Sequence, residues 1–161
     1  MNTTKEQSVT HSTFVIERSY PAAPERVFAA FADPAKKRRW FAEGDHHGLE
    51  HYELDFRVGG KERVRMRLGA DTPLKGVACV NDVTYLDIVT NRRIVNASTM
   101  TVGERCISAS LVTFELAPTK AGTELTFTHQ GAFFEGADGP EMREEGWRKL
   151  LDELAKEFAG A

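Results

Sequence analysis

Residues 146–158 read GWRKLLDELAKEF, and this stretch decides the fold. Its large apolar residues recur at positions i, i+3, i+4, i+7 and i+11, which are Trp147, Leu150, Leu151, Leu154 and Phe158. This spacing places the five side chains on one face of an α-helix. A helix with one continuous apolar face must bury that face against another layer of structure. The rest of the chain must therefore supply a large apolar surface.

Upstream of this helix, apolar and polar residues alternate, which is the pattern of β-strands. The pattern predicts strands at residues 13–20, 51–58, 62–68, 83–90, 94–101, 105–117 and 123–130. Most spacers between them are short, and parallel pairs need long crossovers, so we expect sequential antiparallel pairing. The predicted partner of the long helix is the concave face of this antiparallel sheet.

Proline and aspartate residues mark where the helices begin. Pro24 suits the first turn of a short helix after the first strand, and Asp33 is a candidate N-cap for a second short helix. Asp138 and Glu141 have the spacing of a capping box at the start of the long helix. The order is strand, two short helices, six strands and one long helix, which predicts an α+β fold.

Bulk composition fits one globular domain. The chain has 161 residues, of which 41% are hydrophobic and 28% charged, and its net charge is -3. A nucleic-acid-binding protein would be clearly basic, so that class is excluded. Residues 1–11 have no apolar period, so we expect a disordered tail there and a single domain at residues 12–161. No stretch resembles a signal peptide or a membrane span, which predicts a cytoplasmic location.

The two cysteines, Cys79 and Cys106, each lie in a strand-like run and lack the spacing of a zinc site. We expect two reduced core thiols. The alternative is a single disulfide between neighbouring strands.

Five short motifs occur together in the order of a known family. They are APERVF at 23–28, DP at 33–34 followed by RWF at 39–41, DFRVGG at 55–60, TELTFTH at 123–129, and GW at 146–147 followed by Leu151 and Leu154. Together they resemble the START-like (SRPBCC) superfamily, and within it the branch named after the activator of the heat-shock-protein-90 ATPase. The resemblance covers about residues 13–159. It implies a helix-grip fold (START-like, or Bet v 1-like), in which a curved antiparallel sheet wraps a long C-terminal helix around a hydrophobic cavity. It implies no universal catalytic residue.

The hairpin around Gly59 and Gly60 determines the polarity of that cavity. With a two-residue turn, Phe56 would face Arg63, and charged side chains would enter the cavity. With a three-residue turn, Phe56 pairs with Val64 and Leu54 pairs with Met66. A shift of one residue exchanges the two faces. We favour the three-residue turn because it matches apolar to apolar residues, and it predicts an apolar cavity with a charged outer face.

Several side chains are candidates for contact with a ligand. The predicted ligand-binding residues are Trp40, Phe41, Met66, Tyr85, Met100, His129, Trp147 and Leu151. For Trp40 and Phe41, which end the second short helix, the alternative is simple core packing. For His129, which shares a face with Leu125 and Phe127, the alternatives are a satisfied core histidine and a metal ligand.

Two charged segments have less specific interpretations. His46, His47 and His51 match no zinc spacing, so the segment is a surface loop, a lid over the cavity or a metal site, in that order of preference. Residues 36–39 are four consecutive basic residues, which favours a solvated helix face over an anion site.

Three functions are compatible with these residues. We favour binding of a small hydrophobic ligand, such as a lipid, without a cofactor or metal. The second hypothesis is a stress-response protein that acts on a chaperone ATPase, which an exposed apolar patch on the outer sheet would support. The third is an enzyme of cyclase or hydrolase type, which needs an ionisable group with a shifted pKa in the cavity. No nucleophile or nucleotide motif is present, so no catalytic residue is assigned. A homodimer through the sheet edges is compatible with the sequence.

Overall fold

The computed structural model describes residues 8–43, 48–69 and 74–159. The strands are β1 (Thr10–Tyr20), β2 (Leu49–Leu54), β3 (Lys61–Arg67), β4 (Ala78–Val89), β5 (Arg93–Val102), β6 (Arg105–Thr119) and β7 (Gly122–Phe133). The helices are α2 (Pro24–Ala32), α3 (Pro34–Lys37), the π-helical turn η1 (Arg38–Glu43), α4 (Pro140–Ala155) and the 3₁₀ turn η2 (Lys156–Phe158). Of the predicted tail, Thr10 and His11 belong to β1, and residues 1–7 lie outside the described residues.

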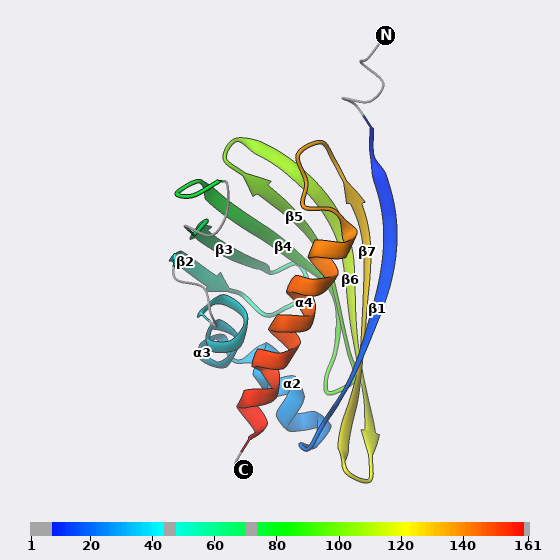
Figure 1. Ribbon diagram of the computed structural model, residues 1–161. Helices are drawn as coiled ribbons and strands as arrows, with labels where there is room; N and C mark the ends of the chain where they lie inside the picture. The colour runs from blue at the N-terminus through cyan, green and yellow to red at the C-terminus, as the bar shows by residue number, and fades with distance from the viewer. Residues whose placement is uncertain (1–7, 44–47, 70–73, 160–161) are drawn as a thin grey trace.

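One antiparallel sheet of seven strands forms the body of the molecule, in the order β1-β7-β6-β5-β4-β3-β2. The sheet is curved, and α4 crosses its concave face (Figure 1). Helices α2 and α3 lie at one end of that face, next to the C-terminal end of α4 (Figure 1). The predicted α+β helix-grip architecture is confirmed.

The apolar stripe of α4 lies where its spacing predicted. Leu151 and Leu154 are fully buried, and Phe158 is 3% exposed in the turn that follows the helix. Trp147 is only partly buried, and its ring centroid lies 4.5 Å from that of Phe127 on β7. Burial of each large apolar side chain contributes about 1.5–3 kcal/mol. The stripe therefore anchors α4 firmly at its C-terminal half.

The predicted starts of α3 and α4 are both confirmed, but the capping box predicted for α4 is absent. Asp33 caps α3, because its carboxylate accepts a 2.9 Å hydrogen bond from the backbone N–H of Ala35. Helix α4 begins at Pro140, and Gly139 at the N-cap position has no side chain that could cap it. The Asp138 carboxylate does not cap the helix because it binds the guanidinium of Arg143.

Both predicted hairpin registers are wrong. Strand β2 ends at Leu54, which pairs with Glu62, and Tyr52 pairs with Val64. The chain then folds back on itself over residues 55–60, where the N–H of Gly60 donates to the carbonyl of Arg57 at 2.8 Å. The connection is thus longer than either predicted turn. It keeps the predicted faces for Val64 and for the arginines of β3, and Glu62, two residues before Val64, shares the inner face.

The cysteines differ in burial. Cys79 is buried, as predicted, whereas Cys106 is exposed near the start of β6. Both are free thiols. The prediction of two core thiols is therefore wrong for Cys106, whose side chain lies at the rim of the sheet rather than inside it.

Candidate functional site

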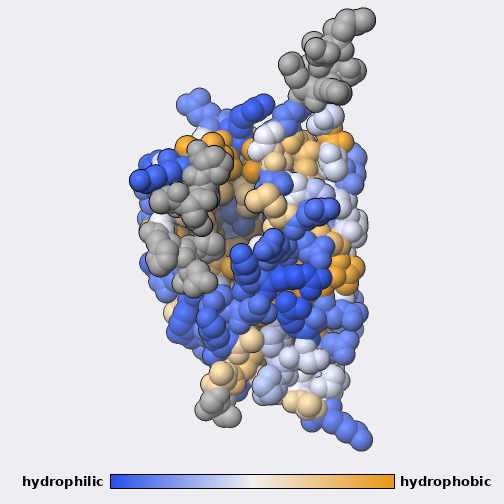
Figure 2. Space-filling model, viewed as in Figure 1, coloured by the Kyte–Doolittle hydropathy of each residue, from blue (hydrophilic) through white to orange (hydrophobic). Residues whose placement is uncertain are grey.

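A cavity of about 230 Å³ lies between strands β3–β5 and the first half of α4. In the space-filling view, the surface is hollowed beside this part of α4 (Figure 2). Its walls are mainly apolar and come from the sheet, from η1 and from the helix. The lining residues are Phe41, Val64, Met66, Cys79, Asn81, Met100, Asp138, Met142, Arg143, Gly146, Trp147 and Leu150.

Sulfur-containing side chains form much of the wall. Three of the four methionines of the chain, Met66, Met100 and Met142, line the cavity together with Cys79. Met66 and Cys79 are direct cross-strand partners on β3 and β4. Methionine side chains are unbranched and adaptable, so such a wall can follow the outline of different apolar molecules.

Gly146 lies at the cavity, in the interior of α4. Beyond its chain neighbours and the backbone of its own helix turns, a Cβ atom built there would meet no atom within 4 Å. Helix interiors disfavour glycine by about 0.5–1 kcal/mol relative to alanine. Packing therefore does not require a glycine at this position. The helix neighbours at i±4, Met142 and Leu150, also line the cavity. Gly146 and Met142 are exposed, so a side chain at 146 would stand on the outer side of the cavity, which we call its mouth.

An ion pair forms the polar end of the cavity. The guanidinium of Arg143 donates to both Asp138 carboxylate oxygens, at 2.8 and 2.7 Å, and to the Ser108 hydroxyl at 3.0 Å. Arg143 is only 8% exposed. It also lies over the ring of Phe133, 5.1 Å from the centroid. Arg143 thus ties the start of α4 to β6 and β7.

A second buried ion pair lies behind the Phe41 wall of the cavity. The ammonium of Lys37 on α3 lies 3.0 Å from the carboxylate of Glu62 on β3. The same carboxylate accepts hydrogen bonds from Tyr85 at 2.8 Å and from Tyr52 at 2.6 Å. Burial raises the pKa of both tyrosines, and the Glu62 carboxylate raises it further, so both hydroxyls stay protonated donors. Phe41 rests on the ammonium, 4.3 Å from ring centroid to Nζ.

This pair corrects two predictions. The basic run at residues 36–39 was expected to be a solvated helix face, but Lys37 is buried. The inner face of the hairpin was expected to be wholly apolar, but it carries Glu62. The two charges are stable inside because they neutralise each other and because both tyrosines donate hydrogen bonds to the Glu62 carboxylate.

Comparison with known proteins identifies the family. The family described as Activator of Hsp90 ATPase homolog 1-like protein matches residues 21–159. The chain belongs to this family.

Solved structures agree with that assignment. Protein Mll3558 from Rhizobium loti is 49% identical, with a TM-score of 0.83, and the match covers 93% of this chain and 99% of that one. A protein from Rhizobium leguminosarum is 38% identical, with a TM-score of 0.88, over 94% and 97% of the two chains. Protein CV1439 from Chromobacterium violaceum is 27% identical, with a TM-score of 0.71, over 92% and 99%. No curated protein matches the sequence.

Within this Activator of Hsp90 ATPase homolog 1-like chain, four of the eight predicted site residues line the cavity. These are Phe41, Met66, Met100 and Trp147. Trp40, Tyr85 and Leu151 are instead fully buried core residues. The Trp40 indole donates a 2.8 Å hydrogen bond to the carbonyl of Ala30, and Tyr85 binds Glu62.

The remaining candidate, His129, lies on the inner face of β7 but outside the cavity lining. Its ring stacks on Phe14 with centroids 4.7 Å apart. Its Nδ1 atom is buried and has no hydrogen-bond partner among the described residues. Burial lowers the pKa of His129 to about 4, and the positive charge of Arg143 adds to that shift. His129 is thus a neutral core histidine at neutral pH.

Sequence reasoning missed the polar residues of the cavity. Asn81 was not predicted because the fourth strand was expected to begin at Val83, whereas β4 begins at Ala78. Arg143 carried a usable signal, since it stands four residues before Trp147 and so shares the apolar face of α4. Because arginine is charged, Arg143 was not counted among the apolar residues of that face.

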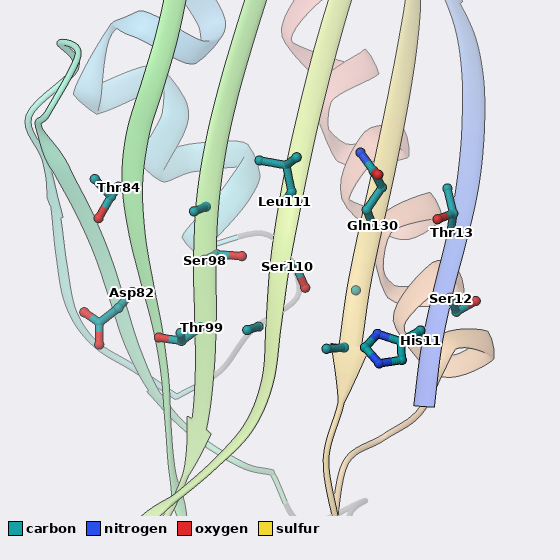
Figure 3. Close-up of a pocket in the computed structure, with 14 residues that line it drawn as sticks. His11, Ser12, Thr13, Asp82, Thr84, Ser98, Thr99, Ser110, Leu111 and Gln130 are labelled. Carbon is teal, nitrogen blue, oxygen red and sulfur yellow. The ribbon is translucent and has the colours of Figure 1, made fainter. Parts of the chain in front are cut away.

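A second hollow lies on the opposite face of the sheet from α4 (Figure 3). It is a shallow groove of about 640 Å³ across β1 and β4–β7. Its floor consists of short side chains such as Ala97, Ala109 and Ala132, with hydroxyl groups around them. The groove is larger than the cavity but more open, and its lining consists of small polar and apolar side chains together with the charged Asp82.

No metal site is found among the described residues. Of the predicted histidine group, His51 lies exposed on β2 beside Glu53, and His46 and His47 lie outside the described residues. Among the described residues, no helix is long and apolar enough to cross a membrane.

Proposed function

We propose that this chain binds a small, mainly apolar molecule in the cavity between the sheet and α4. The observation that carries the proposal is Gly146. The helix bears the cost of a glycine at a position where a side chain would meet nothing, and that position is the mouth of the cavity. A missing or short side chain at this position leaves the cavity accessible, whereas packing of the fold sets no such limit on its size.

The size and chemistry of the cavity indicate the class of ligand. An engineered protein cavity of about 150 Å³ holds benzene, and this one measures about 230 Å³. A molecule of one or two rings, or a short aliphatic chain, therefore fits. Phe41 and Trp147 offer aromatic surface on one side, and Met66 and Met100 offer adaptable surface on the other. Burial of apolar area would supply the affinity, at about 25 cal/mol per Å².

The ionisable groups of the cavity favour binding over catalysis. Asp138 and Arg143 neutralise each other through two hydrogen bonds. Burial raises the pKa of the Cys79 thiol, which keeps it in its unreactive protonated form. A cyclase or hydrolase needs a free acid, base or nucleophile next to its substrate, and none of these three groups has that character.

The chaperone hypothesis receives less support from the surface. It calls for an exposed apolar patch. The exposed large apolar residues of the strands include Val15, Leu86 and Leu111, which lie on β1, β4 and β6. These strands are not neighbours in the sheet, so another strand separates each of the three side chains from the next.

Equilibrium dialysis with naphthalene tests the proposed function. The proteins are the wild type, Gly146→Ala and Gly146→Leu. Both substitutions remove the glycine from the helix, so both should raise stability by about 0.5–1 kcal/mol. Only leucine reaches across the mouth. We expect the wild type and Gly146→Ala to bind naphthalene with similar affinity, and Gly146→Leu to bind at least ten times more weakly.

Two results would overturn the proposal. One is a wild-type protein that retains no naphthalene at concentrations near its solubility limit. The other is equal binding by all three proteins, because the probe would then occupy some site other than this cavity. Urea unfolding of each variant verifies that a loss of binding is not a loss of fold.

A further inference from the structure

Two polar side chains of the cavity, Asn81 and Arg143, have N–H groups without a partner among the described residues, and these groups indicate the chemistry of the ligand. Asn81 stands on β4 between Val64 on β3 and Met100 on β5, and all three line the cavity. Among the described residues, none hydrogen-bonds to the Asn81 side-chain amide. An amide left without a hydrogen bond in an apolar setting costs about 1–3 kcal/mol. The amide therefore needs water or a polar group of the ligand.

Arg143 supplies a second donor at the same cavity. Its Nε and Nη2 atoms bind Asp138 and Ser108, and no described residue binds its Nη1. Among the described residues, one polar side-chain atom is both buried and without a hydrogen-bond partner, and it is Nδ1 of His129. Because Nη1 of Arg143 also lacks a partner among these residues, it is exposed to solvent rather than buried. Guanidinium N–H groups donate only. The ligand group near Arg143 must therefore be an acceptor.

The charges around these donors exclude ionised ligands. Arg143 and Asp138 both line the cavity, and they form a closed pair with no net charge. An anion drawn to Arg143 would be repelled by the Asp138 carboxylate, and a cation would be repelled by Arg143. Removing either ion from water into an apolar cavity would add a desolvation cost. The pair instead suits a neutral group that accepts one hydrogen bond and donates another.

We propose that the natural ligand is an uncharged molecule, apolar over most of its surface, with a hydroxyl group that hydrogen-bonds to Asn81 and the Arg143–Asp138 pair. This inference rests on the proposed function and narrows it to neutral alcohols and phenols. A hydroxyl accepts from the Nη1 of Arg143 or the amide N–H of Asn81, and it donates to the amide oxygen or the carboxylate. The apolar part then lies against Phe41 and Trp147.

Equilibrium dialysis with three probes of one shape tests the inference. The probes are naphthalene, 2-naphthol and 2-naphthoate at pH 7, where 2-naphthol is neutral and 2-naphthoate is an anion. The proteins are the wild type and Asn81→Leu, which replaces the amide by an apolar side chain of similar size. We expect the wild type to bind 2-naphthol at least ten times more tightly than either other probe. In Asn81→Leu, the preference for 2-naphthol over naphthalene should fall about tenfold.

The outcomes separate this inference from the proposed function. If naphthalene binds as tightly as 2-naphthol, or if 2-naphthoate binds most tightly, the inference is overturned and apolar binding stands. If Asn81→Leu weakens the binding of naphthalene and of 2-naphthol equally, Asn81 does not hydrogen-bond to the hydroxyl. The inference is then overturned as well. If the wild type retains none of the three probes, the proposed function fails and the inference fails with it.

Discussion

The ammonium of Lys37 lies 3.0 Å from the carboxylate of Glu62, and the two side chains are only 4% and 1% exposed. The residues are 25 positions apart in the sequence. Their contact joins the short helix α3 to strand β3 at the end of the sheet that α2 and α3 cover. Because Phe41 rests on the same ammonium, the ion pair also fixes one wall of the cavity.

The first prediction concerns this pair. Lys37→Met leaves the Glu62 charge buried without its partner, which should lower the free energy of unfolding by about 3–5 kcal/mol. The double variant Lys37→Met/Glu62→Gln removes both charges and keeps an acceptor for Tyr52 and Tyr85, so it should be more stable than the single variant. Urea denaturation measures all three proteins. Lys36→Met, at the partly exposed neighbour, is the control and should change stability by less than about 0.5 kcal/mol. A single variant as stable as this control would contradict the prediction.

The second prediction concerns the pH dependence of stability. The pKa of His129 is lowered from 6.5 to about 4 in the folded protein. Between these values the unfolded chain binds a proton that the folded chain does not, so stability should fall as the pH falls from about 6.5 to 4 and be unaffected by this group above 6.5. A shift of that size corresponds to about 3 kcal/mol.

The matched variant for this prediction is His129→Phe, which keeps a ring against Phe14. Urea unfolding at several pH values gives the stability profile of each protein. The difference in unfolding free energy between the variant and the wild type should grow in favour of the variant as the pH falls toward 4. Parallel profiles would show that His129 does not titrate differently in the two states.

The third prediction separates the two tryptophans. Trp40→Phe removes the hydrogen bond to the carbonyl of Ala30 in the last turn of α2 and leaves that buried acceptor unpaired. The expected loss is about 1–3 kcal/mol of unfolding free energy. Trp147→Phe removes an indole that is only partly buried and has no hydrogen-bond partner among the described residues. It should cost less. Thermal or urea unfolding compares the two, and an equal or reversed order would refute the prediction.

The fourth prediction uses the cysteines as reporters. Burial raises the pKa of the Cys79 thiol, and Cys106 is exposed. At pH 7, N-ethylmaleimide should therefore alkylate Cys106 faster than Cys79. Saturation with 2-naphthol should slow the reaction of Cys79, which lines the cavity, and leave Cys106 unchanged. Mass spectrometry of the alkylated peptides follows both rates, and equal protection of the two thiols would speak against occupation of the cavity.

Local pattern predicted the elements of this fold well, because each element follows a short-range rule. The i, i+3, i+4 spacing from Trp147 to Phe158 was enough to place α4, and alternation was enough to find all seven strands. The failures are contacts between distant segments. The Lys37–Glu62 pair depends on how α3 docks on β3, and the charge of each residue outweighs a local sign of burial such as the two-residue spacing of Glu62 from Val64.

The same reasoning explains the candidate site. Phe41, Met66, Met100 and Trp147 were predicted because apolar residues on an inner face naturally surround a cavity. Asn81 and Arg143 were missed because a polar residue on an inner face reads locally as a solvent-exposed one. The start of β4 at Ala78 places Asn81 on the inner face, and the four-residue spacing from Trp147 places Arg143 on the apolar face of α4.

In the proposed function, entry to the cavity depends on position 146, where packing of the fold does not limit the side chain. On this proposal, a relative with alanine there would keep an open entrance, and one with leucine or phenylalanine would have a narrower one. All of them would share the same sheet, helix and core. Members of one family could thus diverge into size-selective carriers and sealed, ligand-free proteins through one codon, while their overall architectures remained superimposable.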